Sequence, residues 1–215
     1  MKLKLTLFMF ILFLSSCNRQ NRIEQEYYVT DVNVVEFLTL TLCIDNNGKS
    51  KSIQINQSKT TYDNQKMIDG IIQKNKDIVY PLESKLNGMC FDYTYQFVNK
   101  KYERKIKNPS ECQNFDEFKT GDFKYESILY PNVLVKRNDS LQVETDGKSK
   151  FVYSIAWKSD CEYALTYKEV NNPKFDYLIG KTIHVKIIEK LTHDSYLYHS
   201  NLLNRTNGTG IMTKI

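Results

Sequence analysis

The second half of the chain repeats one short pattern, and this repetition limits the folds open to it more than any other feature. Eight segments alternate between apolar and polar side chains with the period of a half-buried β-strand. Most of the turns between them are rich in Asn, Asp and Gly. The segments are 119–125, 133–137, 141–145, 151–157, 162–168, 183–191, 196–202 and 210–215. Short strands at this spacing predict an antiparallel β-meander over 112–215, forming a small barrel or a curled sheet.

The first half combines the same alternation with one change of period. Leu38, Leu40 and Leu42 share one face of a predicted strand, with polar side chains on the other face, and Met67 and Ile71 share a helical stripe. The predicted elements are strands at 37–44 and 52–56, a helix near 64–75, and a strand at 91–98. We therefore expect an amino-terminal ββαβ module at 27–99, a linker at 100–111, and an α+β fold class.

Both halves resemble known proteins. Residues 37–98 resemble the carboxy-terminal domain of TonB-type energy transducers through Cys43-Ile44-Asp45, Asn47-Gly48-Lys49, Tyr80-Pro81 and Tyr95-Gln96-Phe97-Val98. The resemblance implies the ββαβ order. It does not extend to energy transduction, because a transducer has a proline-rich spanning segment and this chain has only four prolines. Residues 112–215 resemble small Bacteroidetes envelope proteins that have no known role, and the expected barrel is similar in architecture to lipocalins. The matching segments are 112–115, 119–123, 137–142 and 157–163.

The amino terminus carries a short apolar run behind Lys2 and Lys4 that ends in Leu14-Ser15-Ser16-Cys17. The run is far shorter than the roughly 20 residues of a membrane-spanning helix and fits a secretory signal. It resembles a bacterial lipoprotein signal, which implies that residues 1–16 are removed and that Cys17 is acylated and binds membrane lipid. An ordinary signal peptide with a chance cysteine is the alternative. Residues 17–26 then form a lipidated tether.

The balance of charged side chains limits the classes of partner, and the segment after Cys17 bears on the location of the protein. Without residues 1–16 the chain keeps 28 basic and 25 acidic side chains. This balance is too even for nucleic-acid binding, which needs a strongly basic surface. The segment after Cys17 has no acidic cluster of the kind associated with surface export in Bacteroidetes. We expect a lipid-anchored envelope protein, in the outer membrane and facing the periplasm.

Four cysteines remain once Cys17 is assigned to lipid, and an exported chain meets an oxidising compartment. Sequence alone allows three pairings of Cys43, Cys90, Cys112 and Cys161. Because the linker separates the first two from the last two, we predict the bridges Cys43–Cys90 and Cys112–Cys161. Zinc binding is the rival interpretation, but no two of these cysteines have the short spacing of a structural zinc site.

Catalytic motifs are absent from the sequence. It contains no nucleophile elbow, phosphate-binding loop or dinucleotide fingerprint. His184, His193 and His199 lack the spacing of a zinc protease. We therefore expect no catalytic residue, no metal, no cofactor and no enzymatic activity. A hydrolase is the least favoured hypothesis.

Two features of the second half are candidates for a functional role. Tyr153, Trp157, Tyr163 and Tyr167 occupy inward positions, where they either line a ligand cavity or fill a core. Ser140, in Asp139-Ser140-Leu141, matches the acceptor pattern of O-glycosylated Bacteroidetes envelope proteins. The leading hypothesis is a non-catalytic binding or scaffolding module that uses the edge of the first sheet to bind an envelope protein. A carrier of a small apolar ligand is the alternative.

Overall fold

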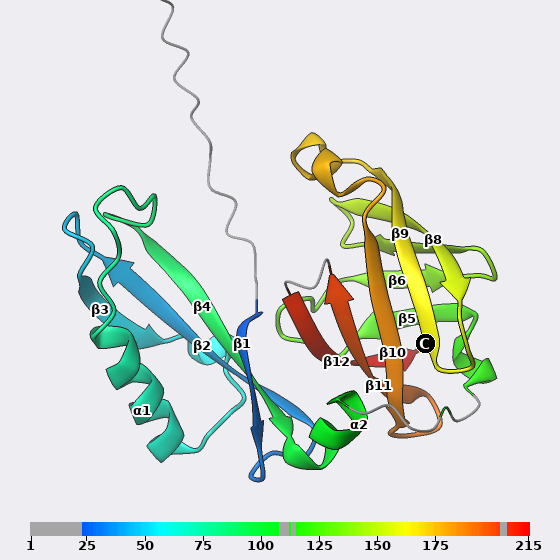
Figure 1. The fold of residues 1–215 in the computed structure, drawn as a ribbon, viewed down its shortest axis with the longest axis horizontal. Coiled ribbons are helices and arrows are strands. Elements are labelled where there is room, and N and C mark those ends of the chain that lie inside the picture. The colour runs from blue at the N-terminus through cyan, green and yellow to red at the C-terminus, as the bar shows by residue number, and fades with distance from the viewer. Residues whose placement is uncertain (1–22, 108–111, 113–114, 203–205) are drawn as a thin grey trace, which may run out of the picture.

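The computed structural model describes residues 23–107, 112, 115–202 and 206–215 (Figure 1). In these ranges the chain forms a four-stranded sheet followed by a closed, eight-stranded antiparallel barrel. The expected α+β class is therefore met in its coarse form. No helix in the described ranges has both the length and the apolar character that crossing a membrane requires. The predicted signal at 1–16 and Cys17 lie outside the described residues.

The sheet module contains one strand that the sequence did not predict. Its elements are β1 (Ile23–Val29), β2 (Val35–Ile44), β3 (Ser50–Ile55), the 3-10 helix η1 (Gln57–Lys59), α1 (Gln65–Lys76) and β4 (Cys90–Asn99). The strand order is β1-β4-β2-β3, and only β1 runs parallel to its neighbour. The order along the chain is thus βββαβ rather than ββαβ. It also places 23–26, expected in the tether, inside a strand.

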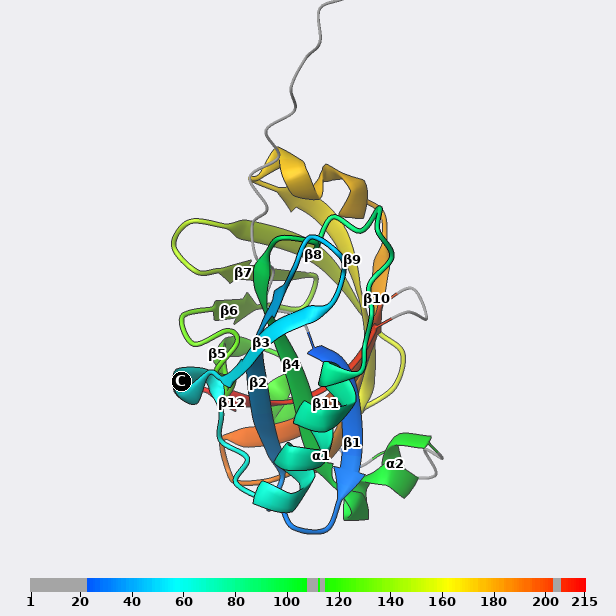
Figure 2. The ribbon, with the colours of Figure 1, turned by 90° about the vertical axis from the view of Figure 1, so that its left-hand side faces the viewer.

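One face of the sheet packs against α1. Leu38 and Leu40 are fully buried beneath the helix residues Ile68 and Ile71. Tyr62, just before the helix, stacks on the ring of Phe97 with 3.7 Å between ring centroids. Figure 2 looks onto this face and shows α1 in front of the sheet and the barrel behind it.

The opposite, polar face of the sheet packs against the barrel. Gln96 is fully buried, and its amide donates to the main-chain oxygen of Thr209 in the barrel. The main-chain N–H of Thr209 donates in turn to Glu26 of β1 at 3.1 Å. Beside these polar contacts, Val98 of β4 packs with Leu197 of the barrel. The alternating side chains of β4 therefore face an aromatic core on one side and a polar interface with the barrel on the other. Neither face is a simple solvent-exposed surface.

The barrel is a simple meander in which each strand pairs with the next. Strand β12 pairs with β5 and closes the ring, so the structure selects the barrel over the curled sheet. Each predicted strand overlaps an observed one. The strands are β5 (Gly121–Tyr125), β6 (Leu134–Arg137), β7 (Leu141–Thr145), β8 (Lys150–Trp157), β9 (Glu162–Val170), β10 (Thr182–Lys190), β11 (Ser195–Leu202) and β12 (Thr206–Lys214).

The expected linker is partly helical. It forms the 3-10 helix η2 (Lys100–Tyr102) and α2 (Glu103–Lys107), and 108–111 lie outside the described residues. Tyr102 is buried between sheet and barrel, and Lys105 forms an ion pair with Glu189 of β10. The first part of this segment therefore packs against the barrel.

Both predicted disulfide bridges are confirmed. Cys43 and Cys90 lie directly opposite each other on β2 and β4 and are bonded. Cys112 is bonded to Cys161, in the loop between β8 and β9. Each bridge stays within one half of the fold, as the division at the linker predicted.

Candidate functional site

The barrel encloses a cavity of about 560 Å³ that opens at one end. Three connections at that end contribute to its lining: β5–β6, β7–β8 and β9–β10, the last of which carries the 3-10 helix η4 (Pro173–Leu178) at the top of Figure 1. None of the described residues in the loops at the other end lines the cavity. In the described part of the chain, these three connections therefore border the mouth.

Aromatic rings form much of the cavity wall. Tyr153 and Tyr167, from neighbouring strands, lie 4.6 Å apart between ring centroids. Phe151 lies 5.4 Å from Phe175, which η4 places at the mouth. Aliphatic side chains complete the wall, including Leu165, Ile183, Val185 and Met212. The cavity wall is thus rich in aromatic and aliphatic side chains, with polar side chains between them, and these ring pairs are tilted to each other.

The carboxylate of Glu144 on β7 lies in the wall of this cavity. Its Oε1 accepts hydrogen bonds from the Tyr125 hydroxyl and from the Gln142 amide, each at 2.7 Å. Its Oε2 accepts a longer bond, 3.3 Å, from the Tyr153 hydroxyl. Burial raises the pKa of Glu144 above its ordinary value, although these three donors act in the opposite direction. The part of the side chain that remains exposed faces the cavity.

Arg137 on β6 lies beneath the cavity floor. It is only 4% exposed, and the rings of Phe123 and Tyr163 lie within 5 Å of its guanidinium carbon. Its guanidinium donates hydrogen bonds to four oxygen atoms, all of them neutral. These are Gln142 Oε1 at 2.7 Å, the Phe118 main-chain oxygen at 2.9 Å, Tyr163 Oη at 3.0 Å and Tyr196 Oη at 3.2 Å. Gln142 therefore connects the guanidinium, through its oxygen, to Glu144, through its nitrogen.

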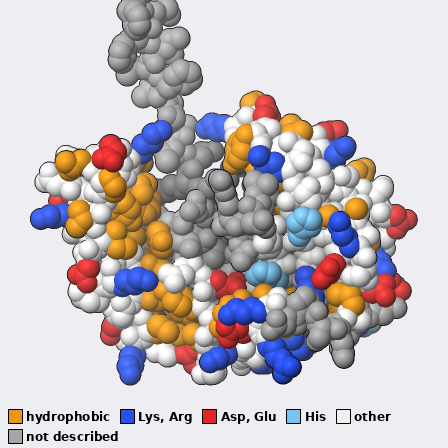
Figure 3. Space-filling view, viewed as in Figure 1, with side chains coloured by type: hydrophobic (Ala, Val, Ile, Leu, Met, Phe, Trp, Pro, Cys, Tyr) orange, Lys and Arg blue, Asp and Glu red, His pale blue; other side chains and the backbone are white. Residues whose placement is uncertain are grey.

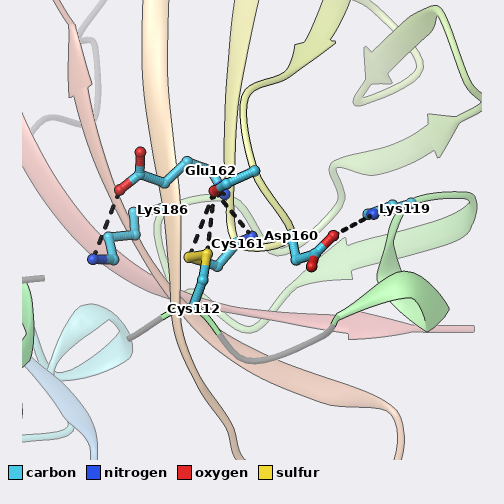
Figure 4. The surroundings of a disulfide bond; sticks show 7 residues. Cys112, Lys119, Asp160, Cys161, Glu162 and Lys186 are labelled. Atoms are coloured by element: carbon cyan, nitrogen blue, oxygen red, sulfur yellow. Dashed lines mark hydrogen bonds and ion pairs between the residues drawn. A yellow bond between two sulfur atoms is a disulfide. The ribbon is translucent and has the colours of Figure 1, made fainter. Parts of the chain in front are cut away.

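The end of the barrel opposite the mouth is closed and densely packed. The 3-10 helix η3 (Asp116–Phe118) inserts Phe118, which is fully buried against Tyr196. The Cys112–Cys161 bridge ties the segment before η3 to the β8–β9 loop (Figure 4). Lys119, just after η3, pairs with Asp160 of the same loop at 3.1 Å. These contacts hold η3 over the barrel end.

The predicted aromatic residues divide between cavity and core. Tyr153, Tyr163 and Tyr167 line the cavity, whereas Trp157 does not. Trp157 is the last residue of β8 and lies at the closed end, where its ring packs 4.6 Å from Tyr163 and beneath Lys119. Both interpretations of this cluster therefore apply, each to a different half of the barrel. Inward orientation was predictable, but depth within the barrel was not.

The two charged residues of the interior, Arg137 and Glu144, were missed by sequence analysis. On β7 the buried residue is Gln142, while Leu141 is 39% exposed, so the polar side chains of this strand face inward. On β6 the inward position of Val135 is shared by Arg137. The sequence signal was that Arg137 lies two residues after Val135, so both side chains face the same side of the strand.

The other candidate residues lie elsewhere. Ser140 is exposed in the β6–β7 turn, where its N–H donates to Asn138. His184 and His193 are exposed, and His199 lies 3.0 Å from the Thr209 hydroxyl at the interface with the sheet. Within the described ranges, no three His, Cys, Asp or Glu side chains gather in a way that could hold a metal ion.

No family model, curated protein or solved structure matches this chain significantly. Its function must therefore be argued from the geometry of the barrel. That geometry provides an open cavity, an aromatic surface and the carboxylate of Glu144 within it. These are features that bind and orient a ligand.

Proposed function

We propose that this chain is a lipid-anchored protein of the bacterial cell envelope whose barrel binds a small, largely apolar ligand without converting it. The observation that carries the proposal is the open, aromatic-walled cavity of about 560 Å³. Ligand sites typically measure about 300 to 1,000 Å³ and have mostly apolar walls with a few placed polar groups. Glu144 and its tyrosine donors are polar groups of this kind.

The contrast between the two halves of the barrel supports a binding role. The closed half is filled by large side chains, among which Phe118, Phe123 and Tyr196 are fully buried. Protein interiors normally pack this tightly, because an unfilled volume loses dispersion contacts. In the other half, aromatic side chains surround open space instead, and this arrangement favours a ligand-binding site.

Native mass spectrometry of the chain from residue 18 onward tests this function. We expect a fraction of the protein to carry an additional small-molecule mass after gentle purification. Ile183→Trp, which places a large ring into the cavity from β10, should abolish the additional mass while the circular dichroism spectrum is preserved. Protein without additional mass after expression in several bacterial hosts, and without binding of any added apolar probe, would contradict the proposal.

The anchor forms a separate part of the proposal. The lipoprotein-like signal ending at Cys17 supports attachment by acyl chains, and two disulfides suit an oxidising compartment such as the periplasm. We place the protein in the outer membrane, facing the periplasm. Three acyl chains exceed the two signals that stable anchoring requires.

Replacing Cys17 with serine should release the protein from the membrane fraction. We expect the wild-type chain to incorporate a clickable fatty acid and the Cys17→Ser variant to incorporate none, because serine offers no thiol for the thioether. Cys112→Ser in the otherwise wild-type chain serves as the control and should keep the label, because Cys17 is intact. Equal labelling of the wild type and the Cys17 variant would exclude this anchor.

A second candidate function is binding of an envelope protein by the sheet module. Strand β3 lies at the edge of the sheet, and the nearby segment between α1 and β4 exposes Val79 (63%) and Leu82 (76%). Figure 3 shows apolar side chains gathered over this module. An exposed edge can pair with a strand from another chain. Site-specific photo-crosslinking in cells from position 52 should then yield one defined adduct, and position 150 should yield none.

A further inference from the structure

We propose that the ligand of the barrel is an organic cation, an amine or quaternary ammonium with an apolar body, whose charged end pairs with Glu144. This inference rests on the proposed ligand-binding function and specifies the chemistry of its ligand. Its basis is the combination of one inward carboxylate, surrounding aromatic rings and the charge of the cavity lining.

The charge of the lining favours a cation. Among the described residues that line the cavity, the charged side chains are Glu144 and Asp146, and there is no Lys, Arg or His. Asp146 lies at the mouth, and its Oδ1 accepts from the main-chain N–H groups of Lys148 and Ser149 in the β7–β8 turn. Glu144 is therefore the carboxylate placed to meet a ligand inside the barrel.

The hydrogen bonds around Glu144 suit an ionised carboxylate. Gln142 must direct its amide oxygen toward Arg137, because a guanidinium only donates, so its NH₂ group faces Glu144. The hydroxyls of Tyr125 and Tyr153 also donate to the carboxylate. Oε2 receives only the longer of these bonds, 3.3 Å, and so retains capacity to accept from an ammonium N–H.

Arg137 does not offer an alternative site for an anion. Its donors are directed at Gln142, Tyr163, Tyr196 and the Phe118 main chain, and aromatic rings cover its faces. Gln142, Tyr163 and Met212 line the cavity above it, whereas Arg137 itself does not. Among the described residues, an anionic ligand would therefore meet the Glu144 charge and no accessible cation.

The rings near Glu144 provide the remaining part of a cation site. Tyr125 and Tyr153 contact the carboxylate, and Tyr198 lies 6.1 Å from Tyr125 between ring centroids. Aromatic faces attract cations, most strongly where water is excluded, and cages of such rings bind quaternary ammonium groups. The same rings accommodate the apolar body of the ligand.

Four probes with the same ten-carbon chain test the inference by calorimetry below their micelle-forming concentrations. They are decylamine, decyltrimethylammonium, decanol and decanoate. We expect both cations to bind the chain from residue 18 onward at least about 30-fold more tightly than decanol, as a desolvated charge pair allows, with decanoate weakest.

The Glu144→Gln variant should lower the affinity for both cations to about that of the same variant for decanol, because an amide carries no charge to pair with them. Glutamine has the size of glutamate, and its amide can exchange hydrogen bonds with Tyr125 and Tyr153. Glu169→Gln is the matched control, because Glu169 is an exposed carboxylate on β9. It should retain the full preference for cations.

A pH titration of the wild-type chain tests the inference without any variant. Burial raises the pKa of Glu144, so its negative charge, and with it cation affinity, should be lost as the pH falls through that raised value. Decanol affinity should not change over the same range. Burial raises the pKa of the neighbouring tyrosines, so they stay neutral over this range: Tyr125, Tyr130, Tyr153, Tyr167 and Tyr198. The guanidinium of Arg137 stays charged.

The outcomes separate this inference from the function on which it rests. Equal affinity for decylamine and decanol, or preference for decanoate, overturns the cation assignment and leaves a ligand-binding barrel. Failure of all four probes to bind, with no co-purified mass, overturns both. Cation preference that survives in Glu144→Gln or at low pH excludes Glu144 as its source.

Discussion

Replacing Arg137 with alanine will lower the free energy of unfolding by about 3 to 5 kcal/mol, because buried acceptors lose their donor and a cavity remains. The substitution leaves the amide oxygen of Gln142 and the main-chain oxygen of Phe118 without their donor, and it opens space between two rings. For a chain of this size the melting temperature should fall by roughly 6 to 20 °C. Thermal unfolding followed by near-ultraviolet circular dichroism measures the change.

Two further variants define the cause of this loss. Arg137→Met keeps most of the side-chain volume but donates no hydrogen bond, so it should remain clearly less stable than the wild type if the hydrogen bonds matter most. Lys136→Ala alters the exposed neighbour on the same strand and should shift stability by no more than about 0.5 kcal/mol. An Arg137→Ala variant within 1 kcal/mol of the wild type would show that the network does not stabilise the barrel.

Removing the Cys43–Cys90 bridge should cost about 4 kcal/mol. The two cysteines are 47 residues apart in sequence, and a cross-link of this span removes much of the conformational entropy of the unfolded chain. In the folded state they lie opposite each other in the β2–β4 register, so the double alanine variant keeps the native pairing of the strands. Urea unfolding of Cys43→Ala/Cys90→Ala measures the loss.

Hydrogen exchange should assign the loss to the sheet module. Amides of β2 and β4 are expected to exchange faster in the double variant, whereas amides of the barrel strands keep their protection, because the second bridge at Cys112 and Cys161 remains. A variant that unfolds at the wild-type urea concentration would contradict a stabilising role for the first bridge.

Local alternation was sufficient to predict the barrel strands, because every second residue of a barrel strand faces the same interior. It failed at β1, where Glu24, Gln25 and Glu26 interrupt the apolar pattern. This strand pairs through its backbone with β4, and Glu26 contacts the barrel. A strand bounded by a polar interface therefore gives no apolar signal in a single sequence.

The candidate site was predictable only in part, for a related reason. Tyr153, Tyr163 and Tyr167 could be assigned to the interior by their phase, but the floor that separates cavity from packed core depends on Arg137 and its long-range partners. Tyr196, one of these partners, is 59 residues away in sequence. The position of Trp157 below this floor follows from the same contacts, which no local pattern encodes.

A methyl nuclear magnetic resonance titration of the chain from residue 18 onward with decylamine tests directly whether the barrel binds a ligand. Binding in the barrel predicts shift changes at the cavity methyl groups of Leu165, Ile183, Val185 and Met212, saturating at one ligand per chain. The methyl groups of Leu38 and Leu40, buried in the sheet module, should not move. Unchanged cavity signals at saturating ligand, or changes confined to the sheet module, would contradict a ligand-binding barrel.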